Sequence, residues 1–390
     1  MNKQLLILLS VVFIDLAGFG VVIPLIPQLI QDTTGYNPFL VGLVIGLYSL
    51  FQFIFTPIWG RLSDKYGRKP ILAITMFINV IAYGIIWLAP NLWIIMLGRI
   101  LGGIGTGNLP VVYAYVADTS DASNRTKKLS LINSMFGLGF IIGPFVGGIT
   151  ADQYGLHFPF LLTAILSLIN ALFILFALPE SNKALQKHIK IEIINIKVIK
   201  SVLAPKNISF LIFLFFLTNA SLALIIGILP LYTDFKFGWD ELRTSYYFMA
   251  IGVASFLTQA FLIQLLLKKW DEVRLIKIGM IIFGIASFGI GIALNEMFLI
   301  ASGMFSALGF SLMNANIQGL ISLESKPEEQ GAVMGVAQSA AALARVIGPI
   351  AGGILAEIIL PLPYLISGIL IFLVFIWGFK QLRFMRDTSS

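Results

Sequence analysis

Residues 142–149 read Ile-Gly-Pro-Phe-Val-Gly-Gly-Ile, and residues 347–354 read Ile-Gly-Pro-Ile-Ala-Gly-Gly-Ile. Two residues after each copy an alanine is followed by an acidic residue, Asp152 in the first case and Glu357 in the second. A chance match of the glycine and proline pattern together with its acidic end is improbable. The chain therefore contains an internal repeat, which predicts two related halves.

The composition is that of a membrane protein. Hydrophobic residues make up 58% of the 390 residues and charged residues 12%, with a mean hydropathy of +0.93, whereas soluble domains are nearer half apolar and a quarter charged. The apolar runs reach the roughly 18 residues that a helix needs to cross the hydrocarbon layer. Polar or Pro/Gly-containing breaks separate twelve runs, near residues 31–38, 60–70, 90–91, 117–128, 152–157, 179–207, 233–242, 267–274, 295–296, 322–329 and 358–362. We predict an all-α membrane protein with twelve transmembrane helices in two pseudo-symmetric six-helix bundles.

The basic residues predict the orientation. With a cytoplasmic N-terminus, almost all of the 26 Lys and Arg residues fall in cytoplasmic segments, the exceptions being Lys236 and Arg243 outside and Arg99 and Arg345 within spans. The positive-inside rule therefore places both termini in the cytoplasm, on the inner side of the cytoplasmic (inner) membrane. Topology and contact with anionic lipid account for the net charge of +7, so no nucleic-acid partner is expected.

The longest polar segment, residues 179–207, predicts a cytoplasmic linker between an N-terminal bundle, 1–178, and a C-terminal bundle, 208–390. Its Ile residues with interspersed Lys favour a segment that lies on the anionic leaflet. Parallel six-span repeats place a binding site near the membrane midplane between the halves.

Enzymatic and metal-dependent functions are disfavoured. The chain has no Cys, and its two His residues, His157 and His188, are far apart in sequence, which leaves little for a metal site. No loop gathers a nucleophile, a base and an acid. We therefore expect neither a metal nor a cofactor.

Asp15 and Arg99 are the candidates for proton coupling, because a charge inside a span is costly and so indicates function. Asp15 lies about 15 Å along the first span by helical rise and is the only acidic residue deep in a span. Arg99 lies at a similar depth in the fourth span, so the two side chains can pair. Burial favours the neutral form of a carboxylate, and a nearby guanidinium favours proton release from it. Purely structural roles, in packing and in backbone hydrogen bonding, are the alternatives.

The repeated motif has no chemistry of its own. Gly139, Gly143, Gly147 and Gly148 permit close helix contact, and Pro144 removes a backbone hydrogen bond, so the segment is a candidate hinge between spans five and eight. Ordinary tight packing explains it equally well.

Neutral polar residues within spans are candidates for the lining of a substrate cavity, although each is as readily explained by an interhelical hydrogen bond. They are Gln52, Asn108, Tyr113, Asn219, Gln259, Asn314 and Gln338. Arg345, three residues before Gly348, is a further candidate. The ionised Asp15 with Arg99 and Arg345 gives a net positive site, which favours neutral, zwitterionic or anionic amphipaths over cations. Neutralisation of Arg345 by backbone carbonyls of a neighbouring helix is the alternative.

The loop after the second span reads Gly60-Arg61-Leu62-Ser63-Asp64-Lys65-Tyr66-Gly67-Arg68-Lys69-Pro70. Here the chain resembles the major facilitator superfamily, specifically its twelve-span drug/proton antiporter branch. The loop follows that family's G-x-L-x-D-x-x-G-R-K pattern, Arg99 and its glycines follow the fourth-span pattern, and residues 139–148 follow the antiporter pattern of span five. The chain also resembles bacterial tetracycline/proton antiporters nearly end to end, except that Ala82 and Phe283 stand where that group has further intramembrane carboxylates.

The resemblance implies the major facilitator fold and a monomeric drug efflux protein that exchanges protons for small amphipathic compounds by alternating access. Gly60, Asp64, Gly67, Arg68 and Asp118 are the candidate gating residues. We expect Asp64 to approach the start of span eleven near residues 330–331, where helix N–H groups attract a carboxylate, and Arg68 to pair with Asp118. A role in topology alone is the alternative for this loop. A proton-coupled transporter of a specific metabolite or lipid, including an importer, and a receptor or assembly factor without transport stay open as alternative functions.

Overall fold

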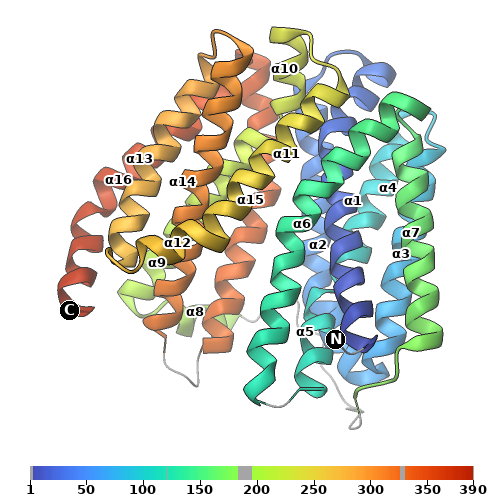
Figure 1. Ribbon diagram of the computed structural model, residues 1–390, viewed down its shortest axis with the longest axis horizontal. Coiled ribbons are helices and arrows are strands. Elements are labelled where there is room, and N and C mark those ends of the chain that lie inside the picture. Colours follow the sequence, from blue (N-terminus) through green and yellow to red (C-terminus); the bar gives the residue numbers. More distant parts are fainter. Residues whose placement is uncertain (1–2, 121, 183–195, 326–329, 390) are drawn as a thin grey trace. The chain divides into compact units, whose positions relative to one another are not determined.

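The computed structural model describes residues 3–120, 122–182, 196–325 and 330–389, which are helical apart from short turns (Figure 1). The helices are α1 (Lys3–Thr34), α2 (Pro38–Tyr66), α3 (Arg68–Trp87), α4 (Leu92–Thr106), α5 (Leu109–Asp118), α6 (Ala122–Tyr154), α7 (Phe158–Ala177), α8 (Ile196–Val202), α9 (Lys206–Ile226), α10 (Leu229–Phe237), α11 (Glu241–Leu257), the π-helix η1 (Thr258–Leu262), α12 (Ile263–Leu266), α13 (Glu272–Gly291), α14 (Glu296–Leu323), α15 (Gln330–Ile358) and α16 (Leu362–Ser389).

The prediction of an all-α multi-pass membrane protein is confirmed, but the count of twelve spans is not matched in full. Among the described residues, ten helical segments are long and apolar enough to cross a membrane, with α4 and α5, α9 and α10, and α11 to α12 each forming one segment. The other two expected spans are helices as well: α6 stands in the fifth position, and α16 has a shorter apolar part, Leu362–Gly378.

The chain divides into two compact units. Unit 1 comprises residues 1–36, 47–194 and 240–249, and unit 2 comprises residues 37–46, 195–239 and 250–390. This division differs from a simple cut at the predicted linker, because the first part of α2 packs with unit 2 and the first part of α11 packs with unit 1. Residues 183–195 of the linker predicted over 179–207 lie outside the described residues.

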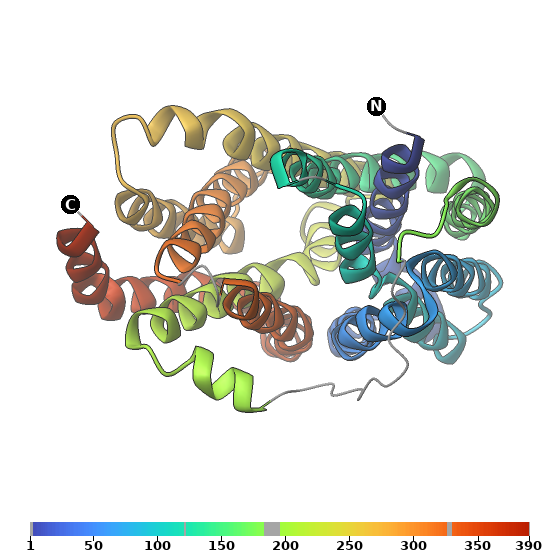
Figure 2. The same ribbon diagram turned by 90° about the horizontal axis from the view of Figure 1, so that it is seen from below.

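The internal repeat is visible in the neighbours of each helix. In unit 1, α1 packs against α6 and α7, and α3 packs against α4 and α7. In unit 2, α9 packs against α15 and α16, and α13 packs against α14 and α16. Figure 2 shows the same helices from below, close to end-on. The two units therefore use the same packing pattern, as the repeated sequence predicts.

The glycines of the repeat explain this packing. A Cβ atom added at Gly143 of α6 would run into the carbonyl oxygen of Ala17 of α1, and one at Gly348 of α15 would run into Ala223 of α9. Only a residue without a side chain permits backbones to approach so closely. The same device therefore joins equivalent helices in both units.

A break between α4 and α5 brings a polar side chain toward α1. Pro110 is the second residue of α5, and because proline lacks an N–H and clashes with the preceding turn, it cannot continue α4. The chain turns at Gly107 and Asn108 before the helix resumes. Asn108 thus lies at the level of Asp15, where it is almost completely buried.

Candidate functional site

Asp15 is buried inside unit 1 and held by two amide side chains. Asp15 is only 7% exposed. The Nδ2 group of Asn79 donates to Oδ1 at 2.7 Å, and the Nδ2 group of Asn108 donates to Oδ2 at 3.0 Å. Each carboxylate oxygen therefore accepts one amide hydrogen bond, and together the two bonds fix the plane of the carboxylate.

The α3 residues around Asp15 form a polar stripe. Thr75, Asn79 and Tyr83 are spaced four residues apart, so they lie on one face of α3. Thr75 accepts a hydrogen bond from Asn108 at 3.3 Å, and the hydroxyl of Tyr83 lies where a Cβ at Gly18 of α1 would be. Asn79 was not among the predicted site residues, although this i, i+4, i+8 pattern of polar residues in an apolar helix indicates it.

Arg99 is buried in the same unit but does not pair with Asp15. Its side chain is 1% exposed, and its guanidinium lies over the ring of Tyr48 of α2, 4.2 Å from the ring centroid. Within the described part of the chain, Nε and Nη2 of Arg99 have no hydrogen-bond partner. The pairing suggested by the equal depth of the two residues is therefore not seen among the described residues, where Asp15 instead accepts hydrogen bonds from Asn79 and Asn108.

The candidate hinge glycines lie at close helix contacts. On α6, Gly139, Gly143 and Gly147 face Leu16, Ala17 and Val21 of α1. Gly148 faces Ser245 of α11, where a Cβ atom would overlap the serine side chain. Pro144 lies inside α6 without ending it and contacts Gly20 of α1. These contacts support the packing interpretation, and the hinge stays a prediction.

Arg68 is the centre of the candidate gating cluster. Its Nη1 contacts Oδ1 of Asp64 at 2.6 Å, and its Nε contacts Oδ2 of Asp118 at 3.1 Å. The expected pair between Arg68 and Asp118 is thus present. Gly67, with a φ of 100°, makes the sharp turn into α3, while Gly60 faces Pro110 with ordinary spacing. The approach of Asp64 to the start of α15 stays a prediction.

Glu180, which follows α7, completes this cluster. Its carboxylate accepts hydrogen bonds from the backbone N–H groups of Arg68 at 2.9 Å and Lys69 at 3.1 Å, the first residues of α3. A carboxylate is stabilised at the N-terminus of a helix, where backbone N–H groups lack partners. Neighbouring residues add to this contact: Ser181 donates to Asp118 at 3.0 Å, and Asn182 donates to the carbonyl of Asp64 at 3.2 Å. Glu180 was not among the predicted site residues, because it lies far from the loop along the chain.

Two of the candidate cavity residues in unit 1 hold helices together. Gln52 donates to Thr106 of α4 with a long hydrogen bond of 3.4 Å, and Asn108 binds Asp15. Tyr113 of α5 is half-buried. For Gln52 and Asn108 the interhelical explanation therefore applies.

In unit 2 the candidate cavity residue Asn314 lies on a polar face of α14, together with Ser311 and Gln318, which were not among the candidates. Ser311, Asn314 and Gln318 of α14 follow an i, i+3, i+7 spacing and so share a face. Asn219 of α9 donates to Asn314 at 3.3 Å, and Gln338 of α15 donates to Gln318 at 3.3 Å.

A third polar contact on this face involves the π-helix. Gln259 of η1 donates to Ser255 at 3.0 Å and to Ser311 of α14 at 3.3 Å. Gln259 and Gln338 are both exposed, and Arg345 of α15 is half-buried. The face of α14 thus carries amide and hydroxyl groups paired with side chains of α9, α11, η1 and α15.

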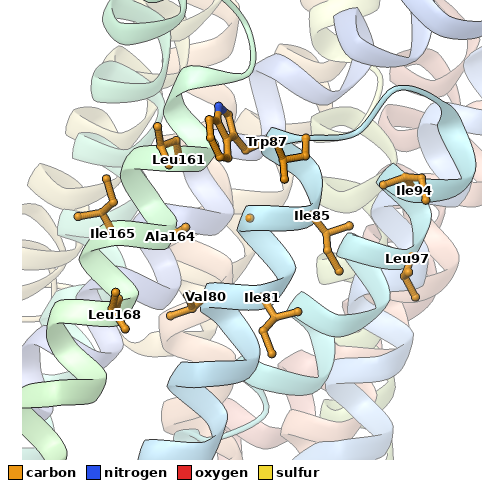
Figure 3. Close-up of a pocket in the computed structure, with 12 residues that line it drawn as sticks. Val80, Ile81, Ile85, Trp87, Ile94, Leu97, Leu161, Ala164, Ile165 and Leu168 are labelled. Atoms are coloured by element: carbon orange, nitrogen blue, oxygen red, sulfur yellow. The ribbon is translucent and has the colours of Figure 1, made fainter.

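A groove on the outer surface of unit 1 lacks amide and hydroxyl groups of this kind in its lining. It lies between α3, α4 and α7, has a volume of about 660 Å³, and is lined by apolar residues such as Ile81, Leu97 and Ile165 (Figure 3). Exposed apolar side chains on spans face lipid. Among the described residues, no cluster of three or more His, Asp or Glu side chains is suitable for a metal ion.

Known proteins resemble this chain over almost its full length. The model of the Major Facilitator Superfamily matches residues 8–296 and 266–388. The class B tetracycline resistance protein of Escherichia coli is 28% identical over 374 residues, which cover 93% of this chain and 90% of that protein. The class D tetracycline resistance protein of Salmonella ordonez is 30% identical, covering 90% and 89%. Multidrug resistance protein 2 of Bacillus subtilis (strain 168) is 28% identical, covering 96% and 95%.

Solved structures agree on the fold. The human organic anion transporter MFSD10 (TETRAN) has a TM-score of 0.72 at 20% identity, covering 96% of this chain and 98% of that chain. The nucleoside transporter NupG has a TM-score of 0.79 at 14% identity, covering 98% and 99%. With the family model matched across both units, the chain belongs to the Major Facilitator Superfamily.

Proposed function

We propose that the protein is a proton-coupled exporter of small amphipathic organic compounds. As a member of this superfamily it is a multi-pass membrane transporter and not an enzyme. Its similarity to tetracycline and multidrug resistance proteins over at least 90% of the chain supports efflux as the direction of transport. Ala82 and Phe283, both apolar and buried, leave Asp15 as the deep acidic residue, so the proposal names no single drug.

The observation that carries the proposal is the environment of Asp15. Its carboxylate is enclosed by α1, α3 and the α4–α5 break, and both oxygens accept hydrogen bonds from neutral amides. A buried carboxylate with neutral partners can change its protonation state without breaking an ion pair. Asp15 therefore binds and releases the coupling proton, and Arg99 contributes a fixed positive charge to the same bundle.

The cytoplasmic cluster around Arg68 supports a role in gating. The two carboxylates of Asp64 and Asp118 and the capping carboxylate of Glu180 join the ends of α2, α3, α5 and α7. We expect a cluster joined in this way to move as a unit. In this proposal, it closes the cytoplasmic side when Asp64 meets the N-terminus of α15, and the glycines of α6 and α15 permit the helices to shift against their neighbours.

Substrate is bound by the polar face of α14. The amides of Asn314 and Gln318 offer donors and acceptors without a net charge, together with the amides of Asn219, Gln259 and Gln338, while the buried hydroxyl of Ser311 holds Gln259 in place. Exposed amides are costly toward lipid, so a polar ligand or water is their better neighbour. Arg345 of α15 belongs to the same proposed set, and Tyr113 of α5 stays a separate candidate within unit 1. Neutral hydrogen-bonding groups favour amphipathic compounds with several polar substituents.

The proposal also includes the membrane location, the orientation and the assembly state of the protein. The protein lies in the inner membrane with both termini in the cytoplasm, as the distribution of Lys and Arg indicates. It acts as a monomer, exchanges protons for substrate, and needs neither a cofactor nor nucleic acid.

Transport in vesicles tests this function directly. Purified protein is reconstituted into liposomes with an imposed pH gradient, and uptake of tetracycline and of a cationic and an anionic amphipathic dye is followed. We expect accumulation of at least one compound in vesicles that are acidic inside, and none when a protonophore removes the gradient. Flux that does not respond to the gradient would show that the protein is not proton-coupled.

A further inference from the structure

We propose that Asn79 and Asn108 are positioning residues that stabilise the ionised form of Asp15 and so set the pH at which the coupling proton is released. This inference rests on the proposed function and concerns the same site. In the sequence, Arg99 was the residue expected to favour proton release from Asp15. We assign that role to two neutral amides instead.

The geometry makes both amides donors. The carboxylate of Asp15 accepts at Oδ1 from Asn79 at 2.7 Å and at Oδ2 from Asn108 at 3.0 Å. Hydrogen bonds donated to an ionised carboxylate stabilise that form. When Asp15 is protonated, one of its oxygens becomes an O–H donor. That oxygen then accepts poorly from an amide N–H, so one of the two bonds is lost. The clamp therefore opposes the burial that disfavours the charge.

Both amides are themselves held in place. Asn79 is completely buried, and a Cβ atom at Gly105 of α4 would overlap its Oδ1 atom, so the space for Asn79 depends on this glycine. Asn108 is 1% exposed, and its Nδ2 also donates to Thr75, whose hydroxyl donates to Leu72 at 2.9 Å. Asn108 is thus held by a second hydrogen bond, and Asn79 by the close packing around it.

The other helices around α1 bring little charge to this point. On α3 the ionisable residue next to Asn79 on the same face is Tyr83, whose buried hydroxyl lies close to Gly18 of α1. The segment Phe158–Ala177 of α7 has no ionisable residue. On α6, opposite Asp15, the contacts come from Gly139 and Gly143.

The ionisable residues of the remaining neighbours lie farther along their helices. Lys128 and Asp152 of α6 are about 16 Å and 20 Å away from Gly139 by helical rise. On α5 the ionisable residues are Tyr113, Tyr115 and Asp118, and on α4 the charged group is Arg99, which lies over Tyr48. The two amides are thus the direct partners of the Asp15 carboxylate.

Infrared spectroscopy tests the proposal without a substrate. The full-length protein in lipid vesicles is titrated with acid, and the C=O stretch of the protonated Asp15 carboxyl is assigned by its loss in Asp15→Asn. In Asn79→Leu, which removes the donor at similar volume, we expect proton binding to be on the order of tenfold tighter, a change of about 1.4 kcal/mol, so that the band persists to higher pH. Asn108→Leu is expected to act in the same direction.

Two further variants keep the test decisive. Asn170→Leu removes another buried amide, which bonds to Ser10 and Met76 and not to Asp15, and it should leave the titration unchanged. Gly105→Ala displaces Asn79 without removing its amide and should reproduce the shift if Asn79→Leu does not fold. An unchanged midpoint in the folded variants of Asn79, Asn108 and Gly105, or an equal shift in Asn170→Leu, overturns the proposal.

Transport measurements separate this inference from the proposed function. If the native protein shows no gradient-driven flux but the Asn79 variant still shifts the titration of Asp15, the proposed function fails and the clamp stands. If the native protein is proton-coupled and the pH profile of its transport is the same in Asn79→Leu and Asn108→Leu, the clamp fails and the function stands.

Discussion

The guanidinium of Arg99 lies over the ring of Tyr48, 4.2 Å from the ring centroid, and not against the carboxylate of Asp15. A buried cation over an aromatic face gains about 2 kcal/mol when water is excluded. Because Nε and Nη2 have no hydrogen-bond partner among the described residues, the contact with the Tyr48 ring helps to compensate the buried charge. Tyr48 thus has a part in keeping Arg99 inside the bundle.

Two substitutions at Tyr48 should therefore separate the contribution of its ring to stability from that of its hydroxyl. We expect Tyr48→Leu to lower the thermal unfolding midpoint of the detergent-solubilised protein, by an amount equivalent to about 2 kcal/mol, because the charge of Arg99 loses its aromatic contact. Tyr48→Phe keeps the ring and should retain most of the stability. Equal losses in both variants would assign the effect to the hydroxyl.

Asp15→Asn should uncouple transport. The new amide keeps the volume and one acceptor but cannot titrate, so accumulation of substrate against its gradient is expected to be lost, while substrate binding or exchange at equal concentrations persists. Flux with and without a pH gradient in reconstituted vesicles measures this. Normal accumulation by the variant would rule out a proton role for Asp15.

The sequence predicted much of this site, and the reasons for the gaps are local. Asp15 and Arg99 stood out because charge is rare in spans. Asn79 did not, since a single amide in an apolar helix is as readily a packing contact; only its spacing with Thr75 and Tyr83 points inward. The partner of Arg99 depends on the rotation of α2 and α4, which hydropathy does not fix.

The fold was predictable for a similar reason. Long apolar runs determine the helices, and the repeated glycines determine which helices touch, as Gly143 and Gly348 show. Glu180 was not predictable, because its contact with α3 joins residues more than a hundred positions apart. The exchange of the first parts of α2 and α11 between the two units likewise depends on tertiary packing that no local pattern records.

The turn at Gly67 should tolerate no side chain. With a φ of 100° and the carboxylate of Glu180 beside it, Gly67→Ala combines backbone strain with a clash, at a cost of about 1 to 3 kcal/mol. We expect a lower unfolding midpoint and slower transport. Gly155→Ala is the matched control for positive φ, because it has open space around it; it tests whether the contact with Glu180 adds to the strain.

The Arg68 cluster should respond as a unit. Asp118→Asn and Glu180→Gln each weaken one contact of the loop before α3, so both should reduce transport, and the double variant should lose less than the sum of the two. Double-mutant cycles on the transport rate measure this coupling. Strict additivity would mean that the two carboxylates act independently.

Asp64→Asn with unchanged transport would contradict the gating role of Asp64.

Close packing at the repeat predicts equal sensitivity in both units. A Cβ atom at Gly143 or Gly348 overlaps a neighbouring helix, whereas one at Gly84 meets nothing within 4 Å. Gly143→Ala and Gly348→Ala should therefore reduce the unfolding midpoint and the transport rate, while Gly84→Ala, which improves helix propensity on the lipid-facing surface, should be neutral or slightly stabilising. A neutral Gly348→Ala would mean that α15 can move away from α9 without cost.

Arg345 should influence which charge the exported compounds carry. The polar face of α14 is uncharged, so Arg345 of α15, half-buried, and Arg99 leave the spans with a net positive charge even when Asp15 is ionised. Lipophilic cations should then be poor substrates relative to neutral, zwitterionic or anionic compounds of matched size. Competition in vesicles between paired cationic and anionic dyes measures the preference, and Arg345→Gln should reduce it while leaving the proton dependence intact, since Asp15 lies in the other unit. Efficient export of cations by the native protein, unchanged in Arg345→Gln, would show that Arg345 is neutralised within its own bundle and never meets the substrate.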